Sequence, residues 1–290
     1  MIKTILVPVT GFASDEAALE TAYLAARLFN AHIDGLHAKP QWTQVAATMI
    51  TEDVAGAVAD EFFAAFEQET KGLSWRAHRH FAEFLRRRSV AVADTPPAGE
   101  YISAALREVS GAVDETAIAN GRLHDLIVLG RGPQAGGSYD IDPGAVVLGA
   151  GRPVLLAPRQ APENLGPTTA IAWKNTAESA RAITAAMPLL LKAGRITILA
   201  ADEGKGEAET MDSAQAAALQ LRWHGCTVEA RFVAPGKRPV AEAVFEAAQN
   251  ASASLVVMGA YGRARLREFI FGGFTRDVLR DCPLPVLLFH

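Results

Sequence analysis

The chain has 290 residues, half of them hydrophobic, and a formal net charge of −4. That length and apolar content are enough for a large buried core, in one large domain or in two smaller ones. The mixture of acidic and basic residues argues against a surface built for nucleic acid or another polyanion.

The first residues and the two cysteines indicate the cellular setting. The opening MIKTILVPVTG is too short for the apolar part of a signal peptide and resembles a first buried strand. No apolar run approaches the roughly 18 residues of a membrane span. Cys226 and Cys282 have no metal-binding spacing, which favours two reduced thiols. We therefore expect a soluble, cytoplasmic protein without a nucleic-acid or membrane partner.

The chain contains the same pattern twice. The segment KTILVPVTGFASDEAALETAYLAARLFNAHIDGLHA opens the chain, and TTAIAWKNTAESARAITAAMPLLLKAGRITILAADE begins at Thr168. Farther on, HDLIVLGRG matches SLVVMGAYG, and GRPVLLAPR matches LPVLLFH. Such internal repetition indicates two copies of one structural unit. We expect a first unit at 1–160 and a second at 167–290, joined by the Pro- and Gly-containing linker QAPENLGP.

An insertion distinguishes the first unit. Residues 41–73 are expected to form a long helix or a pair of helices, because the apolar residues recur at helical spacing. These residues are Val54, Val58, Phe62, Phe63 and Phe66. The following SWRAHRHFAEF, 74–84, alternates like a strand. On a strand His78 and His80 would share a face that could suit a metal, but no nearby residue completes a ligand set, and an exposed or hydrogen-bonded pair is favoured.

The end of the first unit is degenerate in its glycine pattern. Residues 130–135 match G-x-G-x-x-A, but they follow a late strand, and Pro133 argues against the helix that a dinucleotide site needs. A phosphate on Gly136 and Gly137 stays open. His37 could line this unit's ligand cleft, although a polar residue at a strand end is the favoured interpretation. Asp140 and Asp142 are best explained by turn solvation or by helix capping before Pro143.

In the second unit, short Val-, Ile- and Leu-rich runs alternate with helical patterns. Strands are expected near 168–173, 195–200, 226–233, 254–258 and 284–289, and helices near 177–192, 207–223, 238–250 and 273–281. Apolar runs of this kind are typical of parallel strands buried on both faces. The sequence therefore predicts an α/β protein with two open, five-stranded, mainly parallel, doubly wound sheets of Rossmann-like topology.

A glycine pattern with the spacing G-x2-G-x9-G follows the fourth strand of the second unit. Gly259 and Gly262 come at the strand end, where ligands bind in open α/β sheets. Gly272 and Gly273 come just before a helix, whose free N–H groups and positive dipole end attract anions. Arg263 could add charge, as could Arg265 and Arg267, and Thr275 a hydroxyl. Together these residues indicate a phosphate site that lacks the P-loop lysine.

This spacing, within two α/β copies, resembles the universal stress protein family in its tandem form. The resemblance covers essentially the whole chain and implies units of adenine nucleotide alpha hydrolase-like fold, paired through their last strands about a pseudo-twofold axis. It implies ATP or a related adenine nucleotide as the ligand, with phosphates on Gly259, Gly262, Gly272 and Gly273, assisted by Arg263 and Thr275. Adenosine would lie near Ala172, Trp173, Lys174 and Ala200. A magnesium ion with the phosphates and a homodimer of whole chains stay open.

The sequence departs from the family pattern at two places. Gly273 stands where a Ser or Thr normally follows the third glycine. The first-strand Asp that contacts adenosine in the family is replaced by Thr10 in the first unit and by Lys174 in the second. Lys174 could reach a phosphate, exclude the usual nucleotide pose or simply be solvated. We expect the first unit to keep the fold without binding nucleotide.

The resulting expectation is a stress-response protein that binds nucleotide in its second unit and is not a dedicated enzyme. No nucleophile elbow, HExxH, Walker motif or carboxylate pair is evident, although slow ATP hydrolysis stays open. One alternative is a nucleotide-free interaction protein that works through surfaces such as 41–73 and still unknown protein partners. Another is a site for a different anion, bound by Lys174 and the arginines.

Overall fold

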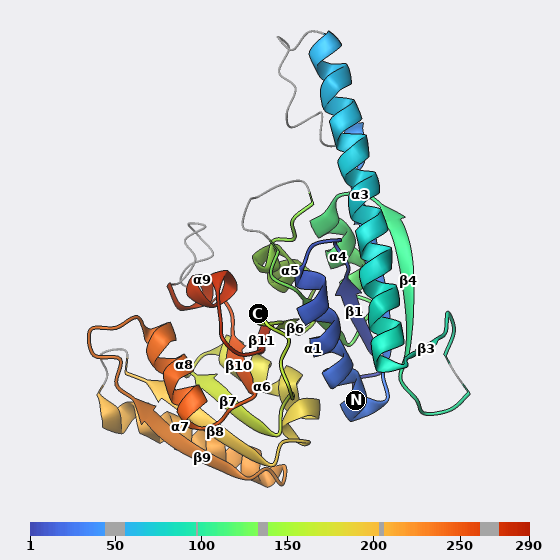
Figure 1. Cartoon of the computed structure of the whole chain (residues 1–290). Coiled ribbons are helices and arrows are strands. Elements are labelled where there is room, and N and C mark those ends of the chain that lie inside the picture. Colours follow the sequence, from blue (N-terminus) through green and yellow to red (C-terminus); the bar gives the residue numbers. More distant parts are fainter. Residues whose placement is uncertain (44–55, 97, 133–138, 203–205, 262–272) are drawn as a thin grey trace.

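The computed structural model describes residues 1–43, 56–96, 98–132, 139–202, 206–261 and 273–290. These residues form one 11-stranded sheet in the order β3-β4-β2-β1-β5-β6-β11-β10-β7-β8-β9 (Figure 1). The strands of the first unit are β1 (Thr4–Pro8), β2 (His32–Lys39), β3 (Ala91–Val92), β4 (Ser103–Ser110), β5 (Leu126–Leu129) and β6 (Val154–Leu156). The strands of the second are β7 (Thr168–Trp173), β8 (Arg195–Ala201), β9 (Val228–Val233), β10 (Leu255–Gly259) and β11 (Val286–Phe289).

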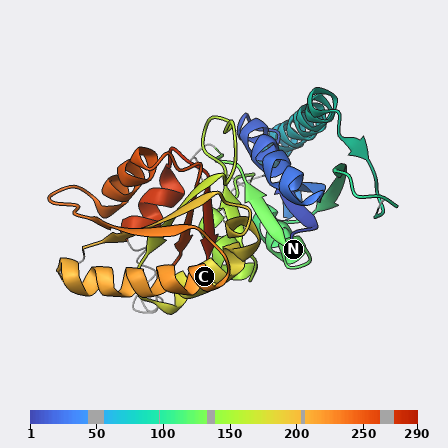
Figure 2. The ribbon, with the colours of Figure 1, turned by 90° about the horizontal axis from the view of Figure 1, so that it is seen from below.

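Helices cover both faces of the sheet (Figure 2). In the first unit they are α1 (Ser14–Phe29), α3 (Gly56–Arg88), α4 (Val113–Gly121) and α5 (Pro143–Gly149). In the second they are α6 (Ala177–Leu190), α7 (Glu207–Trp223), α8 (Val240–Asn250) and α9 (Gly273–Arg280). Among the residues described, no helix combines the length and the apolar character that a membrane crossing requires.

The prediction of two separate sheets is wrong, because the units share one sheet. Strand β6 pairs with β11 in antiparallel register, with Leu155 opposite Leu287, as expected for the last strands of the two units. Each would otherwise be an edge strand with unpaired backbone groups, and edge strands readily pair with one another. All other strand pairs are parallel. The α/β class and the mainly parallel character are confirmed.

Both units follow the same path through the sheet. Counted in chain order without the two-residue β3, each unit places its strands 3-2-1-4-5. The antiparallel pair makes the strands of one unit run opposite to those of the other. The carboxyl ends of the first unit's strands therefore lie at the edge of the sheet where the second unit's strands begin. This reversal decides which loops of the two units meet.

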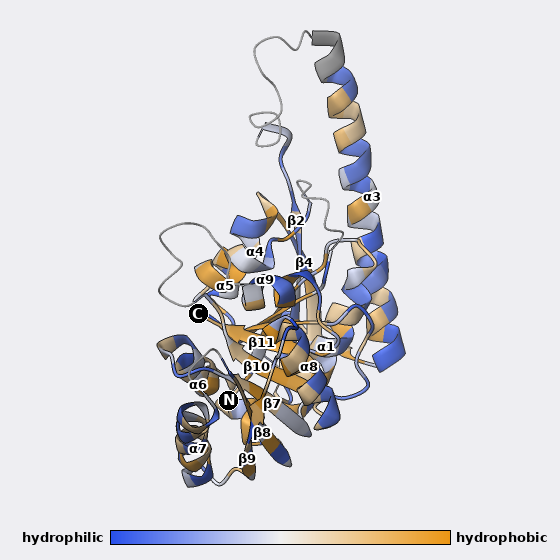
Figure 3. Cartoon of the chain, turned by 90° about the vertical axis from the view of Figure 1, so that its left-hand side faces the viewer, coloured by the Kyte–Doolittle hydropathy of each residue, from blue (hydrophilic) through white to orange (hydrophobic). Residues whose placement is uncertain are grey.

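Two hydrophobic cores lie on the two faces of the sheet, and each continues through both units. One contains side chains of α1, α3, α6 and α7, and the other contains side chains of α4, α5, α8 and α9. In Figure 3 the strands are largely hydrophobic, whereas hydrophilic and hydrophobic residues alternate along the helices. The complete burial of Leu6, Val7, Leu126 and Ile127 explains why the central strands are continuous apolar runs.

The predicted strand at 74–84 is wrong, because this segment continues helix α3. The buried side chains Leu73, Ala77, Phe81 and Phe84 are spaced by four, four and three residues, which places them on one face of a helix. Helix α3 extends well beyond the body of the protein at its amino-terminal end (Figure 1). Residues 44–55, which include Val54 from the predicted helix, lie outside the described part of the chain.

The shared sheet predicts that the two units unfold together. Truncation of the fully buried Leu155 to Ala should lower the free energy of unfolding by about 2–5 kcal/mol, through lost burial and the cavity left behind. Urea unfolding should be followed by fluorescence in two single-tryptophan backgrounds, one that keeps Trp75 and one that keeps Trp173. We expect both midpoints to fall equally. A shift seen only by Trp75 would show that the units unfold independently.

Candidate functional site

The second unit has its topological switch point between β7 and β10. These strands are neighbours in the sheet, but the chain leaves β7 for α6 on one face and β10 for α9 on the other. Divergence of this kind leaves a crevice beyond the carboxyl ends of the strands, where ligands bind in open α/β sheets. The predicted site residues come from this edge.

Gly259, at the end of β10, is required for packing. A Cβ atom at this position would lie 2.6 Å from the carbonyl carbon of Glu178 and 2.6 Å from the amide nitrogen of Ser179, in the first turn of α6. Gly130 of the first unit has the same role, since its Cβ would lie 2.7 Å from the carbonyl oxygen of Ser14 in α1. Gly259 itself does not have a positive φ. Positive φ occurs two residues later, at Tyr261, with a φ of 56°.

Among the described residues, nothing packs against the first residue of α9. Gly273 is exposed, and a Cβ built on it meets no described atom within 4 Å. Thr275 lies in the first helical turn as predicted but is only 7% exposed. Gly262, Arg263 and Gly272 of the predicted site lie outside the described residues, as do Arg265 and Arg267.

The predicted adenosine residues do not share one face. Ala172 packs on the face that carries α8 and α9, whereas Trp173 packs on the face that carries α6 and α7. The Trp173 indole N–H donates a hydrogen bond to Ser213 Oγ at 3.2 Å, which directs the ring toward α7. Ala200 is buried on the same face as Trp173. Lys174 is exposed at the strand end. Of the three residues that pack against a core, Ala172 is therefore the one on the α9 side.

A buried acid in the first turn of α6 was not predicted. Glu178 is 4% exposed and lies directly under Gly259. Burial alone would raise its pKa, but hydrogen bonds from its own backbone N–H and from Thr176, together with the charges of Arg181 and His290, hold the pKa below its usual range. The sequence signal was an acidic residue in the first turn of a helix, a position where such residues are common without a special role.

Asp15 is a buried acid in the first turn of α1, and its hydrogen bonds are internal. Its carboxylate accepts from Thr10 N at 2.9 Å, from Thr10 Oγ1 at 2.9 Å and from Gly11 N at 2.8 Å. His80 Nδ1 lies 3.0 Å from the same carboxylate. A carboxylate with so many donors fixes the loop after β1.

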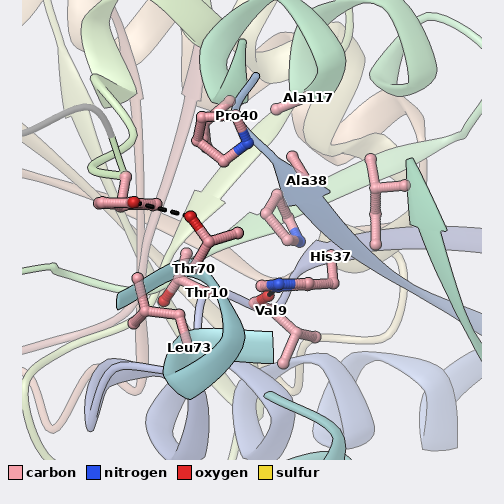
Figure 4. A pocket seen from close by; sticks show the side chains of 12 residues that line it. Val9, Thr10, His37, Ala38, Pro40, Thr70, Leu73 and Ala117 are labelled. Atoms are coloured by element: carbon pink, nitrogen blue, oxygen red, sulfur yellow. Dashed lines mark hydrogen bonds between the residues drawn. The ribbon is translucent and has the colours of Figure 1, made fainter. Parts of the chain in front are cut away.

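The cleft of the first unit is filled by α3. Figure 4 shows Thr70 and Leu73 of this helix beside Val9, Thr10 and His37 at the ends of β1 and β2. A Cβ on Gly11, which has a φ of 86°, would overlap the carbonyl oxygen of Leu73. The remaining cavity has a volume of about 10 Å³, room for about one water molecule. Among the described residues, the ends of β1 and β2 therefore leave no room for a nucleotide beside α3.

His37 joins the strand end to α3. Its Nδ1 lies 2.7 Å from the carbonyl oxygen of Val9, and its Nε2 lies 2.9 Å from Ser74 Oγ. Burial lowers the pKa of His37, so the neutral ring donates from Nδ1 to the carbonyl and accepts the Ser74 hydroxyl at Nε2. His37 is thus a hydrogen-bonded polar residue near the end of β2, in agreement with the favoured interpretation.

The other histidine and aspartate interpretations can also be checked. His78 and His80 are two residues apart on a helix, and they therefore point to different sides instead of sharing a strand face. In the described part of the chain, no cluster of three or more His, Cys, Asp or Glu side chains could hold a metal ion. Asp142 caps α5 by accepting a hydrogen bond from Gly144 N at 2.8 Å, which confirms the predicted helix cap before Pro143. Gly136 and Gly137 lie outside the described residues.

The packing of Gly259 predicts a large difference between two glycines. Gly259→Ala should destabilise the protein by about 1–3 kcal/mol, because its Cβ overlaps backbone atoms of α6 that cannot move separately. Gly273→Ala is the matched control and should change stability little, since the site is open. Urea unfolding measures both. Equal stabilities for the two variants would contradict the packing role.

The neutral His37 predicts a pH dependence of stability. A histidine whose pKa is lowered by folding binds fewer protons in the folded state, so the stability it contributes is lost as pH falls below the unfolded pKa of about 6.5. The free energy of unfolding should fall between pH 7.5 and pH 5.5, and less so in His37→Gln. His32, whose pKa burial also lowers, titrates in both proteins. Parallel pH profiles would exclude His37 as the cause.

Comparison with known proteins identifies the second unit directly. The sequence profile of the universal stress protein family matches residues 172–290. No curated protein matches the chain in a sequence search.

Solved structures extend the likeness in fold to the whole chain. A universal stress protein from Archaeoglobus fulgidus DSM 4304 is similar over 99% of this chain and 95% of its own, with 15% identity and a TM-score of 0.67. A functionally unknown protein from Pseudomonas aeruginosa PAO1 is similar over 99% and 92%, with 18% identity and a TM-score of 0.57. The second unit thus matches the sequence profile of the universal stress protein family, and the whole chain is similar in fold to these two solved structures.

Proposed function

We propose that the second unit binds ATP or a related adenine nucleotide and that the chain holds one nucleotide without being a dedicated catalyst. The observation that carries the proposal is a contrast between the units. In the unit matched by the family profile, no described atom lies within 4 Å of a Cβ built on Gly273 at the start of α9, whereas in the first unit α3 packs on the ends of β1 and β2. The phosphates are placed at the amino-terminal end of α9.

The adenosine position follows from the faces of the strands. Ala172 has no bulky side chain and lies on the α9 side at the end of β7, so it is the proposed neighbour of the base. Trp173 and Ala200 face the other core and are not proposed to touch the ligand. Lys174 is exposed at the rim, where it could approach a phosphate.

Nucleotide complexes are known for two proteins of the universal stress protein family. A family protein from Arabidopsis thaliana has been solved with AMP bound, and another universal stress protein has been solved in complex with cAMP. Those ligands belong to those proteins. For this chain the proposal rests on the open helix start and the filled first cleft.

A second candidate function is protein interaction without nucleotide. It is favoured by the projection of α3 from the body and by Phe62 and Phe63 on it, which are 57% and 40% exposed. The two roles are separated by binding measurements. The untagged protein should be denatured and its small molecules identified by mass, and ATP, ADP and AMP should be titrated by calorimetry with and without magnesium. One site per chain supports the nucleotide role. Two sites would contradict the closure of the first cleft, and none would favour the interaction role.

The open position of Gly273 gives a sharp test of the phosphate location. Gly273→Asp places a carboxylate beside the proposed phosphates and should weaken nucleotide binding at least about tenfold, a change of about 1.4 kcal/mol. The fold should be retained or slightly stabilised, because an acidic side chain favours a helix start. Gly273→Asn is the matched control, equal in size and uncharged, and should bind nearly as well as the wild type. Equal affinities for the Asp and Asn variants would overturn this location.

A further inference from the structure

Arg131 of the first unit contacts helix α9 of the second. It lies two residues beyond β5, in the segment Gly130-Arg131-Gly132 that corresponds to the glycine loop of the second unit. Its guanidinium donates to the carbonyl oxygens of Leu279 at 2.7 Å and Val278 at 2.8 Å, both in the last turn of α9. It also donates to Cys282 Sγ at 2.6 Å, just beyond the helix.

The direction of the strands makes this contact possible. Because the two units run in opposite directions, the loop after β5 lies at the edge of the sheet where α9 ends and β11 begins. Arg131 Nε also donates to the carbonyl oxygen of Ala157 at 3.2 Å, at the end of β6. The Nε of Arg131 therefore bonds to the first unit, while its terminal nitrogens bond to helix α9 of the second unit.

Arginine suits this position chemically. The last carbonyl groups of a helix have no partners within the helix and form its negative dipole end, which attracts a cation. The planar guanidinium presents several N–H groups in a fixed fork, so it can bind two carbonyls and the sulfur at once. Helix α9 has only 8 residues, too few to be stable alone, so its position depends on contacts of this kind.

We propose that Arg131 is a positioning residue for the nucleotide site of the second unit. This inference rests on the function proposed above, in which phosphate binds at the start of α9. The helix is about 12 Å long, so a tilt at its carboxyl end displaces the amide groups at its start. Amide groups that bind phosphate act only when they are held in place, which makes the degenerate loop of the first unit part of the second unit's site.

The first unit provides a matched control. Helix α5 is the counterpart of α9, and the carbonyl oxygen of Gly149 at its end accepts from Arg122 Nε at 3.2 Å and from Arg122 Nη2 at 3.0 Å. This contact lies within one unit, beside a cleft that α3 has filled. Where the first unit has Arg131, the second has Ala260, so no reciprocal arginine reaches α5 from that position.

The experiment compares Arg131→Met with Arg122→Met. Each removes an arginine from a helix end and keeps an unbranched side chain. ATP titration by calorimetry should show a loss of about tenfold or more for Arg131→Met and an unchanged affinity for Arg122→Met. Arg131→Lys, which keeps the charge but not the fork, should recover part of the affinity. Circular dichroism and thermal unfolding establish that each variant is folded.

Hydrogen exchange gives a readout that does not depend on nucleotide. The amides of α9 should exchange faster in Arg131→Met than in the wild type, with no change in Arg122→Met. If the wild type binds ATP and both Met variants bind equally well, the positioning role is overturned and the proposed function stands. If the wild type binds no nucleotide, the proposed function is overturned and this inference falls with it.

Discussion

The antiparallel pair of β6 and β11 is the contact on which the rest of the structure depends. It joins two units of parallel strands into one sheet and satisfies two strand edges at the same time. It also reverses one unit relative to the other, so the loops that follow the strands of the first unit meet the helix that precedes the last strand of the second. The contact of Arg131 with α9 is a consequence of this reversal. A parallel arrangement would have placed these groups at opposite edges.

The two units have diverged at equivalent places while keeping the same strand order. In the first unit α3 lies across the strand ends, and Asp15, His37 and His80 use their polar atoms to hold it and the neighbouring loop. Because buried polar groups are costly unless they are paired, this network specifies one position for α3. A cleft that would otherwise need a ligand to satisfy its polar groups is thereby satisfied from within the chain. The second unit has no comparable helix among its described residues.

The sequence predicted the fold well where local pattern and tertiary structure agree. In the second unit the expected strand at 168–173 and the expected helix at 207–223 coincide with β7 and α7. It failed at 74–84, because alternation over a few residues competes with a helical period that only becomes clear when Leu73 and Phe84 are considered together. The continuous sheet was not predicted, although the pairing of the last strands was expected. That pairing joins the two expected sheets into one.

The candidate site was less accessible to sequence reasoning, for reasons that can be named. The sequence does not say whether a given spacing of glycines makes room for a ligand or for a neighbouring helix. At Gly259 the short distances to Glu178 and Ser179 show that the glycine makes room for helix α6. The side of the sheet to which Trp173 points depends on its position in the strand, because successive side chains point to opposite faces. A shift of one residue in the predicted strand register therefore moves the ring to the other face. Arg131 lies 148 positions from Leu279 in the chain, and no periodicity connects them. Residues that hold a site from another unit become visible only when the pairing of the units is known, which is why a degenerate copy of a motif can still contribute to the function of its partner.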